Sequence, residues 1–311
     1  MDKFLTLINK YNLFDEKVIK QIEGVVKDSN EGGIMYDGGL HRSEKLLPDI
    51  IYNFNLLQQE LLKKGYNFFI ESGFRGYNDQ IKLWFSRTIN ESIKRYGFPP
   101  FNLVSDKTER LIAHLCIDQY PIWYKENPLD KVDGILSIIG RSGSHELEKI
   151  KNDVEFTVAP PGASEHHLGF AFDIGLIDKN GNNCDLTEKK YMQAALDFIS
   201  IAPDYGFILR FPEGKSFFTG FKNEIWHYRY VGSPEIAHEI MDNGLTLEEY
   251  HIAHYIMNNE SFYDQYLNGN LDLDFLNQFV GEEATTLIKR DPTLLDGVRN
   301  YMCTKMNGKK R

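Results

Sequence analysis

The chain is poor in cysteine. Only three occur among its 311 residues, at Cys116, Cys184 and Cys303, and no two of them form a C-x-x-C pair. An odd number of widely spaced cysteines excludes a disulfide framework and a zinc site built from cysteine. We therefore expect three free thiols in a reducing compartment.

Basic charge and long apolar runs are also lacking. Lys and Arg number 35 against 45 Asp and Glu, so the net charge is −10. This charge repels phosphate backbones, and we expect no nucleic-acid partner.

The apolar residues of positions 1–20 are interrupted by charged ones, whereas a signal peptide has an uninterrupted apolar core. No later apolar run is long enough to span a bilayer. We expect a cytoplasmic protein, with export through a removed signal or release by lysis as alternatives. The sequence carries no signal for an oligomeric state.

The chain does contain enough apolar residues, 42%, for a sizeable core, and their periodicity predicts regular elements. Residues 1–30 are typical of one or two amphipathic helices. Further helices are expected over residues 48–64, 78–96, 186–201, 234–243 and 247–258. Strands are expected over residues 67–71, 170–174, 205–210 and 225–231.

The most informative stretch contains His166 and Asp173. His166 lies in a segment rich in Pro, Gly and Ser, and Asp173 follows seven residues later in an expected strand. A loop that folds back over the start of this strand brings both side chains onto one metal ion. The small residues Gly169 and Ala171 leave room for an ion and a substrate beside the sheet.

A second motif, Glu224-Ile225-Trp226-His227, supplies a third ligand, His227. Three protein ligands leave the fourth position of a zinc ion to water, as in catalytic sites. Glu224 and His227 would face opposite sides of a straight strand. We therefore expect Glu224 on the turn before the strand, as the base that takes a proton from the water. Trp226 is expected to point into the core.

Attack on a carbonyl also needs a positive group near the developing oxyanion. Arg75, at the end of the strand expected over 67–71, is the candidate for this positive group. Alternatively, its guanidinium could bind a carboxylate of the substrate through two parallel hydrogen bonds. Taken alone, Arg75 is also typical of a surface ion pair.

Other histidines offer alternatives. His167 could replace His166 as the ligand. His251 and His254 lie three residues apart on an expected helix, a spacing that suits a metal ion and also a partly buried helix face.

These motifs resemble those of the D-Ala-D-Ala metallopeptidases, specifically the vancomycin-resistance type D,D-carboxypeptidases. That family belongs to a wider group with lysostaphin-type peptidases and the hedgehog signalling domain. The matching patterns are S-x-H-x-x-G-x-A-x-D at 164–173, E-x-W-H at 224–227 and S-G-F-R with a later Gln at 72–80. Gly76 replaces the serine that usually follows the arginine.

The resemblance implies a fold, a reaction and roles for residues. The fold is α+β, with a small antiparallel sheet that carries a zinc site and is packed by helices. The reaction is removal of the terminal D-alanine from the stem peptide of a D-Ala-D-Ala-ended peptidoglycan precursor. Zn²⁺ would be bound by His166, Asp173 and His227. Glu224 would be the base, Arg75 would stabilise the transition state, and Ser164 and Gln80 would contact the peptide.

The resemblance also implies a domain organisation. The catalytic domain spans residues 45–250 and contains a helical insertion at about 97–152, which could form a lid or one wall of the substrate cleft. Residues 1–44 and 251–311 are expected to form helical N- and C-terminal extensions.

Three other functions remain open. Two are enzymes of the same family, a D,D-dipeptidase and a phage-type endopeptidase that cuts an L-Ala–D-Glu bond. The third is a zinc-binding module without catalytic activity, against which the presence of Glu224 and Arg75 argues.

Overall fold

The computed structural model describes residues 3–28, 44–80, 83–84, 87, 91 and 152–309. Its centre is an antiparallel sheet of five strands. Four strands lie in the order β3 (Asn67–Ser72), β4 (Ala171–Ile177), β7 (His227–Tyr230) and β6 (Phe207–Leu209), and β5 (Asn183–Cys184) pairs with β4. The predicted α+β fold, a small antiparallel sheet packed by helices, is confirmed.

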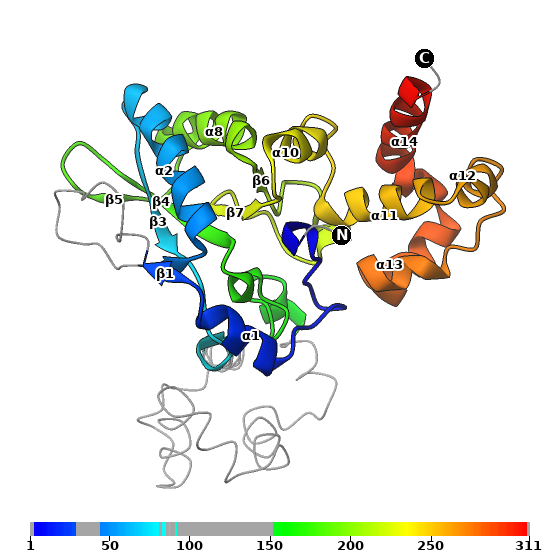
Figure 1. Ribbon diagram of the computed structural model, residues 1–311, viewed down its shortest axis with the longest axis horizontal. Helices are drawn as coiled ribbons and strands as arrows, with labels where there is room; N and C mark the ends of the chain where they lie inside the picture. Colours follow the sequence, from blue (N-terminus) through cyan, green and yellow to red (C-terminus); the bar gives the residue numbers. More distant parts are fainter. Residues whose placement is uncertain are drawn as a thin grey trace, which may run out of the picture.

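One face of the sheet is covered by α2 (Pro48–Lys63) and α8 (Met192–Ile201) (Figure 1). Pro48 stands at the first position of α2, where its missing N–H costs no hydrogen bond. The ring of Phe54 on α2 meets Phe172 of β4 edge to face, with 5.4 Å between centroids. Because side chains alternate along a strand, Asp173 then lies on the opposite face of the sheet.

The C-terminal helices form a second apolar cluster beside the sheet (Figure 1). They are α10 (Pro234–Met241), α11 (Leu247–Met257), α12 (Glu260–Leu267), α13 (Asn277–Arg290) and α14 (Asp296–Lys309). The first turn of α11 is closed by a capping box between Thr246 and Glu249. The side chains of Ile252 and Ile256 are fully buried in this cluster.

The N-terminal segment packs against both parts. The second helix expected within residues 1–30 is α1 (Glu16–Glu23), while the first is reduced to a 3-10 turn at Lys3–Leu5. After this turn, Oδ1 of Asn9 accepts from the backbone N–H groups of Tyr11 and Asn12 and closes a second tight turn, so no helix continues through these residues. Further on, β1 (Lys27–Asp28) pairs with β2 (Lys45–Leu46).

The remaining elements are short. They are η3 (Glu165–Leu168), η4 (Lys189–Tyr191), η5 (Ala202–Tyr205), α9 (Ser216–Thr219), η6 (Asp274–Leu276) and η7 (Pro292–Leu295). The helix expected over 186–201 starts later than predicted, because residues 189–191 form η4 before α8 begins.

Several predictions concern residues that the structure does not describe. The insertion at 97–152 lies outside the described residues apart from Asn152, and so does Cys116. The two described cysteines, Cys184 and Cys303, are free thiols, as expected. Within the described ranges, no helix has both the length and the apolar character required to cross a bilayer.

Candidate metal and catalytic site

Three side chains from different elements meet at one end of the sheet. His166 comes from η3, Asp173 from β4, and His227 is the first residue of β7, directly opposite Asp173 in the strand register. One potential ligand atom from each lies within 4.8 Å of the others. No other group of three such side chains close enough to hold a metal ion is found in the described part of the chain.

Hydrogen bonding fixes which nitrogen His166 presents. Its Nδ1 lies 2.7 Å from the carbonyl oxygen of Gly73. A carbonyl can only accept, so Nδ1 carries the proton and Nε2 keeps its lone pair. Nε2 is 3.3 Å from Oδ2 of Asp173 and therefore faces the cluster. This is the arrangement that holds a histidine ligand in one orientation.

His227 contacts Asp173 through Nδ1, whereas His166 contacts it through Nε2. Nδ1 of His227 lies 2.8 Å from Oδ1 of Asp173, and its ring stacks on Phe211 with 5.0 Å between centroids. Burial lowers the pKa of His227, but the hydrogen bond to Asp173 and the nearby carboxylates of Glu165 and Glu224 outweigh this and raise it to about 9. Despite burial, His166 and His227 hold the pKa of Asp173 well below its usual range. Asp173 is thus held in its ionised form between the two histidines.

The alternative ligand His167 is engaged elsewhere. Its Nδ1 lies 2.7 Å from the carbonyl of Arg75, and its Nε2 accepts from the backbone N–H of Gly162 at 3.2 Å. Both nitrogens are therefore occupied, and burial lowers the pKa of His167 to about 4. The structure gives His167 the role of fixing the loop around Arg75.

The helical pair His251 and His254 is not a metal site either. His251 is buried, and Nε2 of His254 lies 3.0 Å from the hydroxyl of Tyr301. These two histidines instead lie on a partly buried face of α11, which is the other interpretation of their spacing.

Glu224 lies on the turn that precedes β7, as the spacing predicts. Its carbonyl accepts from the backbone N–H of His227 at 3.0 Å, and its own N–H donates to Phe211 at 3.1 Å. Burial raises the pKa of the Glu224 carboxyl to about 7. A carboxyl with this pKa can both accept and release a proton near neutral pH, as a catalytic base must.

Arg75 reaches the site from the loop after β3. Its Nη1 donates to Oε1 of Gln80 at 2.8 Å, and its Nη2 donates to Oγ of Ser72 at 3.1 Å. Its backbone N–H donates to the backbone carbonyl of His166. Gln80 is only 1% exposed, and its Nε2 donates to the carbonyl of Ala159. Both ends of the Gln80 amide are thus occupied, which points to a role in holding Arg75.

A cavity of about 300 Å³ brings these groups together. Its lining includes Arg75, Gln80, Ser164, His166, Asp173, Glu224, Trp226 and His227. Ser164 is 3% exposed. Trp226 packs against the core as expected, but it is only partly buried and also forms a wall of this cavity and of a neighbouring one.

The expectation for Gly169 is wrong. Gly169 does not make room for an ion. It ends η3 in the left-handed conformation, with φ of 70°, and a Cβ there would lie 2.7 Å from Cγ1 of Val26. A glycine is needed because the chain turns sharply after η3 while packed against the N-terminal segment.

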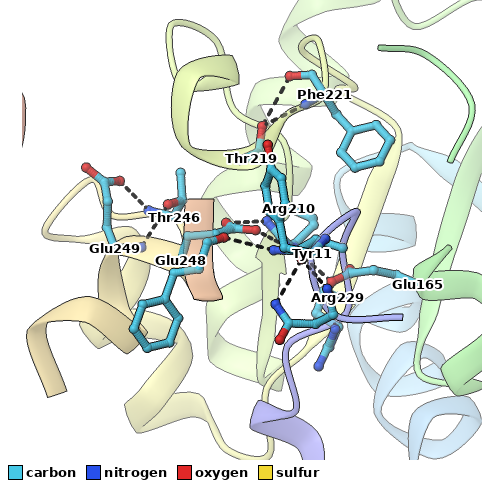
Figure 2. Close-up of polar contacts among 12 residues, drawn as sticks. Tyr11, Glu165, Arg210, Thr219, Phe221, Arg229, Thr246, Glu248 and Glu249 are labelled. Carbon is cyan, nitrogen blue, oxygen red and sulfur yellow. Dashed lines mark hydrogen bonds and ion pairs between the residues drawn. The ribbon is translucent and has the colours of Figure 1, made fainter. Parts of the chain in front are cut away.

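A buried group of charged side chains was not predicted from the sequence (Figure 2). Glu165, Arg210, Arg229 and Glu248 are each at most 4% exposed. Arg210 donates through Nε to Glu165 and through both terminal nitrogens to Glu248, and Arg229 donates to Glu165. Glu165 lies within the motif at 164–173, between Ser164 and His166. The available signal was the position of Arg210 and Arg229 within expected strands, because arginines are seldom buried there unless they are paired.

The chain is similar in sequence to known D-alanyl-D-alanine carboxypeptidases. The family model described as "VanY: D-alanyl-D-alanine carboxypeptidase" matches residues 43–233. A bifunctional D-Ala-D-Ala dipeptidase and D-Ala-D-Ala carboxypeptidase from Enterococcus gallinarum, VanXYC, is 37% identical over 129 residues. That match covers 40% of this chain and 67% of the relative.

A D-alanyl-D-alanine carboxypeptidase from Enterococcus faecalis is 44% identical over 104 residues, covering 32% of this chain and 34% of the relative. The match therefore spans about a third of that relative's length. Among solved structures, a mutant of the vancomycin-resistance D,D-pentapeptidase VanY in complex with Zn(II) aligns with 23% identity and a TM-score of 0.49. That alignment covers 80% of this chain and 99% of the other.

Proposed function

Because the chain belongs to the VanY family of D-alanyl-D-alanine carboxypeptidases, we propose that it removes the terminal D-alanine from D-Ala-D-Ala-ended stem peptides of peptidoglycan precursors. One observation carries the proposal. The His166, Asp173 and His227 cluster shares its cavity with the carboxyl of Glu224 and the guanidinium of Arg75.

The donor set fits Zn²⁺. Two imidazole nitrogens and one carboxylate oxygen are typical ligands of catalytic zinc, and a fourth protein ligand is not required because water takes that position. His166 is oriented for this role by Gly73, which leaves Nε2 free to bind. A zinc ion held by His166, Asp173 and His227 would polarise the peptide carbonyl and lower the pKa of a water molecule to about 7.

The chain's own residues would supply the proton transfers and the charge stabilisation. Glu224 would take a proton as water attacks the carbonyl and deliver it to the leaving amine of D-alanine. Arg75 would donate to the developing oxyanion or to the terminal carboxylate of the peptide. Gln80 would hold the guanidinium of Arg75 in place, and the hydroxyl of Ser164 would face the bound peptide.

A second candidate is a D,D-dipeptidase activity. The Enterococcus gallinarum relative is named for both activities. Both reactions cleave a bond to a C-terminal D-alanine, and they differ in whether the substrate continues beyond the dipeptide. The same site chemistry would serve either substrate.

Product masses distinguish these activities. The purified protein is incubated with a pentapeptide stem ending in D-Ala-D-Ala and, separately, with the free dipeptide, each with and without a chelator. The proposal predicts loss of one alanine from the pentapeptide, and only without chelator. Cleavage of the dipeptide alone supports the dipeptidase, cleavage at L-Ala–D-Glu supports the endopeptidase, and no cleavage with bound zinc supports an inactive module.

A further inference from the structure

The two nitrogens of the His227 ring face different partners. Nδ1 lies 2.8 Å from Asp173 and points into the metal cluster. Nε2 points the other way, to Oε2 of Glu165 at 3.6 Å. This separation is too long for a hydrogen bond, although both residues are less than 5% exposed.

Both facing atoms lack a hydrogen bond in the described part of the chain. Nε2 of His227 and Oε2 of Glu165 are each buried without a partner. Buried polar atoms are nearly always paired, and two such atoms that face each other can pair with a small shift of either side chain. A carboxylate can only accept, so the pair forms when Nε2 carries a proton. A metal ion bound at Nδ1 in turn requires that this nitrogen carry none.

The other oxygen of Glu165 is firmly held. Oε1 accepts from Nε of Arg210 at 2.8 Å and from Nη1 of Arg229 at 2.7 Å. Arg229 is itself fixed by the carbonyls of Phe4 and Thr6, to which its Nη2 donates. Figure 2 shows Glu165 extending from η3 towards these arginines. The two cations thus hold the carboxylate so that only Oε2 is left to meet His227.

We propose that Glu165 is a positioning residue, which accepts the Nε2–H of His227 and so makes Nδ1 the nitrogen that binds the metal. The proposal rests on the metal centre of the proposed function. Metal-bound histidines commonly donate their second N–H to a carboxylate, and losing this partner weakens metal binding by about 10- to 100-fold.

Glu165→Gln tests the proposal with little change in volume. The amide oxygen is expected to take the place of Oε1 between the two arginines, because both only donate. The NH₂ group then faces Nε2 of His227 and donates to it. The ring would carry its proton on Nδ1, the nitrogen that must bind the metal. The variant should therefore fold but bind zinc about 10- to 100-fold more weakly.

Glu248→Gln is the matched control. Glu248 belongs to the same buried group of charges and binds only the far side of Arg210. In this control both arginines still hold Glu165, so zinc affinity should stay within a few-fold of the unaltered protein, whatever the loss in thermal stability. If only the loss of a buried charge mattered, zinc binding would be weakened equally in both variants.

The measurements are zinc affinity by competition with a chelator and the nitrogen-15 NMR signature of His227 in the zinc-loaded, unaltered protein. The proposal predicts a proton on Nε2 and zinc on Nδ1. It is overturned if Nε2 is the metal-bound nitrogen, a result that needs no variant to fold. It is also overturned if Glu165→Gln binds zinc as tightly as the unaltered protein, or if Glu248→Gln weakens binding as much. If the unaltered protein binds no zinc, the metal centre itself fails, and this proposal with it.

Discussion

Asp173 and His227 face each other across two neighbouring antiparallel strands, with Oδ1 of the carboxylate 2.8 Å from Nδ1 of the imidazole. Two of the three proposed ligands are therefore fixed by the register between β4 and β7. His166 completes the cluster from η3, where its ring is held by Gly73. A site built on strands is held more rigidly than one built on loops alone.

We expect His166→Ala to lose stoichiometric zinc and His167→Ala to retain it. The two histidines are adjacent, but only His166 directs a ring nitrogen, Nε2, towards the cluster. Both ring nitrogens of His167 are hydrogen-bonded to backbone groups of Arg75 and Gly162. Elemental analysis of the two purified variants checks this. Full zinc content in His166→Ala would remove it from the ligand set.

Glu224→Gln should keep its zinc and lose turnover by about 10²- to 10⁴-fold, the usual contribution of a general base. Glutamine has nearly the same size but cannot take a proton. The measurements are kcat on a D-Ala-D-Ala-ended peptide and the zinc content of the same sample. Undiminished turnover with full zinc would show that another group acts as the base.

Arg75→Ala should lower kcat/KM by about 10²- to 10³-fold, as for the loss of one oxyanion-stabilising group. Gln80→Leu should give a smaller loss, because Arg75 remains charged and keeps its bond to Ser72. Steady-state kinetics of both variants test this order. A larger effect from Gln80 than from Arg75 would indicate that Gln80 itself contacts the peptide.

Gly169→Ala should lower the free energy of unfolding by about 2 kcal/mol or more, from backbone strain and overpacking. The added Cβ would lie 2.7 Å from Val26. Gly181→Ala is the control, because Gly181 also has a positive φ, of 81°, but has no atom within 4 Å of the Cβ position. Denaturant titration of both variants separates the two causes. Equal losses would show that contact with the N-terminal segment contributes nothing.

The local part of the site was predictable from the sequence. His166 and Asp173 are seven residues apart, and the alternation of β4 separates Asp173 from the core residue Phe172. The position of Glu224 on a turn follows from the same alternation. These inferences need only the geometry of one strand and one loop.

The buried ion pairs next to the site could not be predicted in the same way. Glu165 meets Arg210 and Arg229 across 45 and 64 residues of sequence. Such pairs depend on how β6 and β7 lie in the sheet, and an arginine in a sequence is most often a surface residue. The role of Gly169 was missed for a similar reason, since it depends on packing against Val26, far away in the sequence.

The most direct test of the account is chelation followed by metal return. D-Alanine release from a D-Ala-D-Ala-ended pentapeptide is measured with the purified protein, after removal of metal, and during titration with Zn²⁺. The account predicts that activity disappears on chelation and returns fully with one equivalent of zinc. Release of D-alanine that is unaffected by complete removal of metal would contradict it.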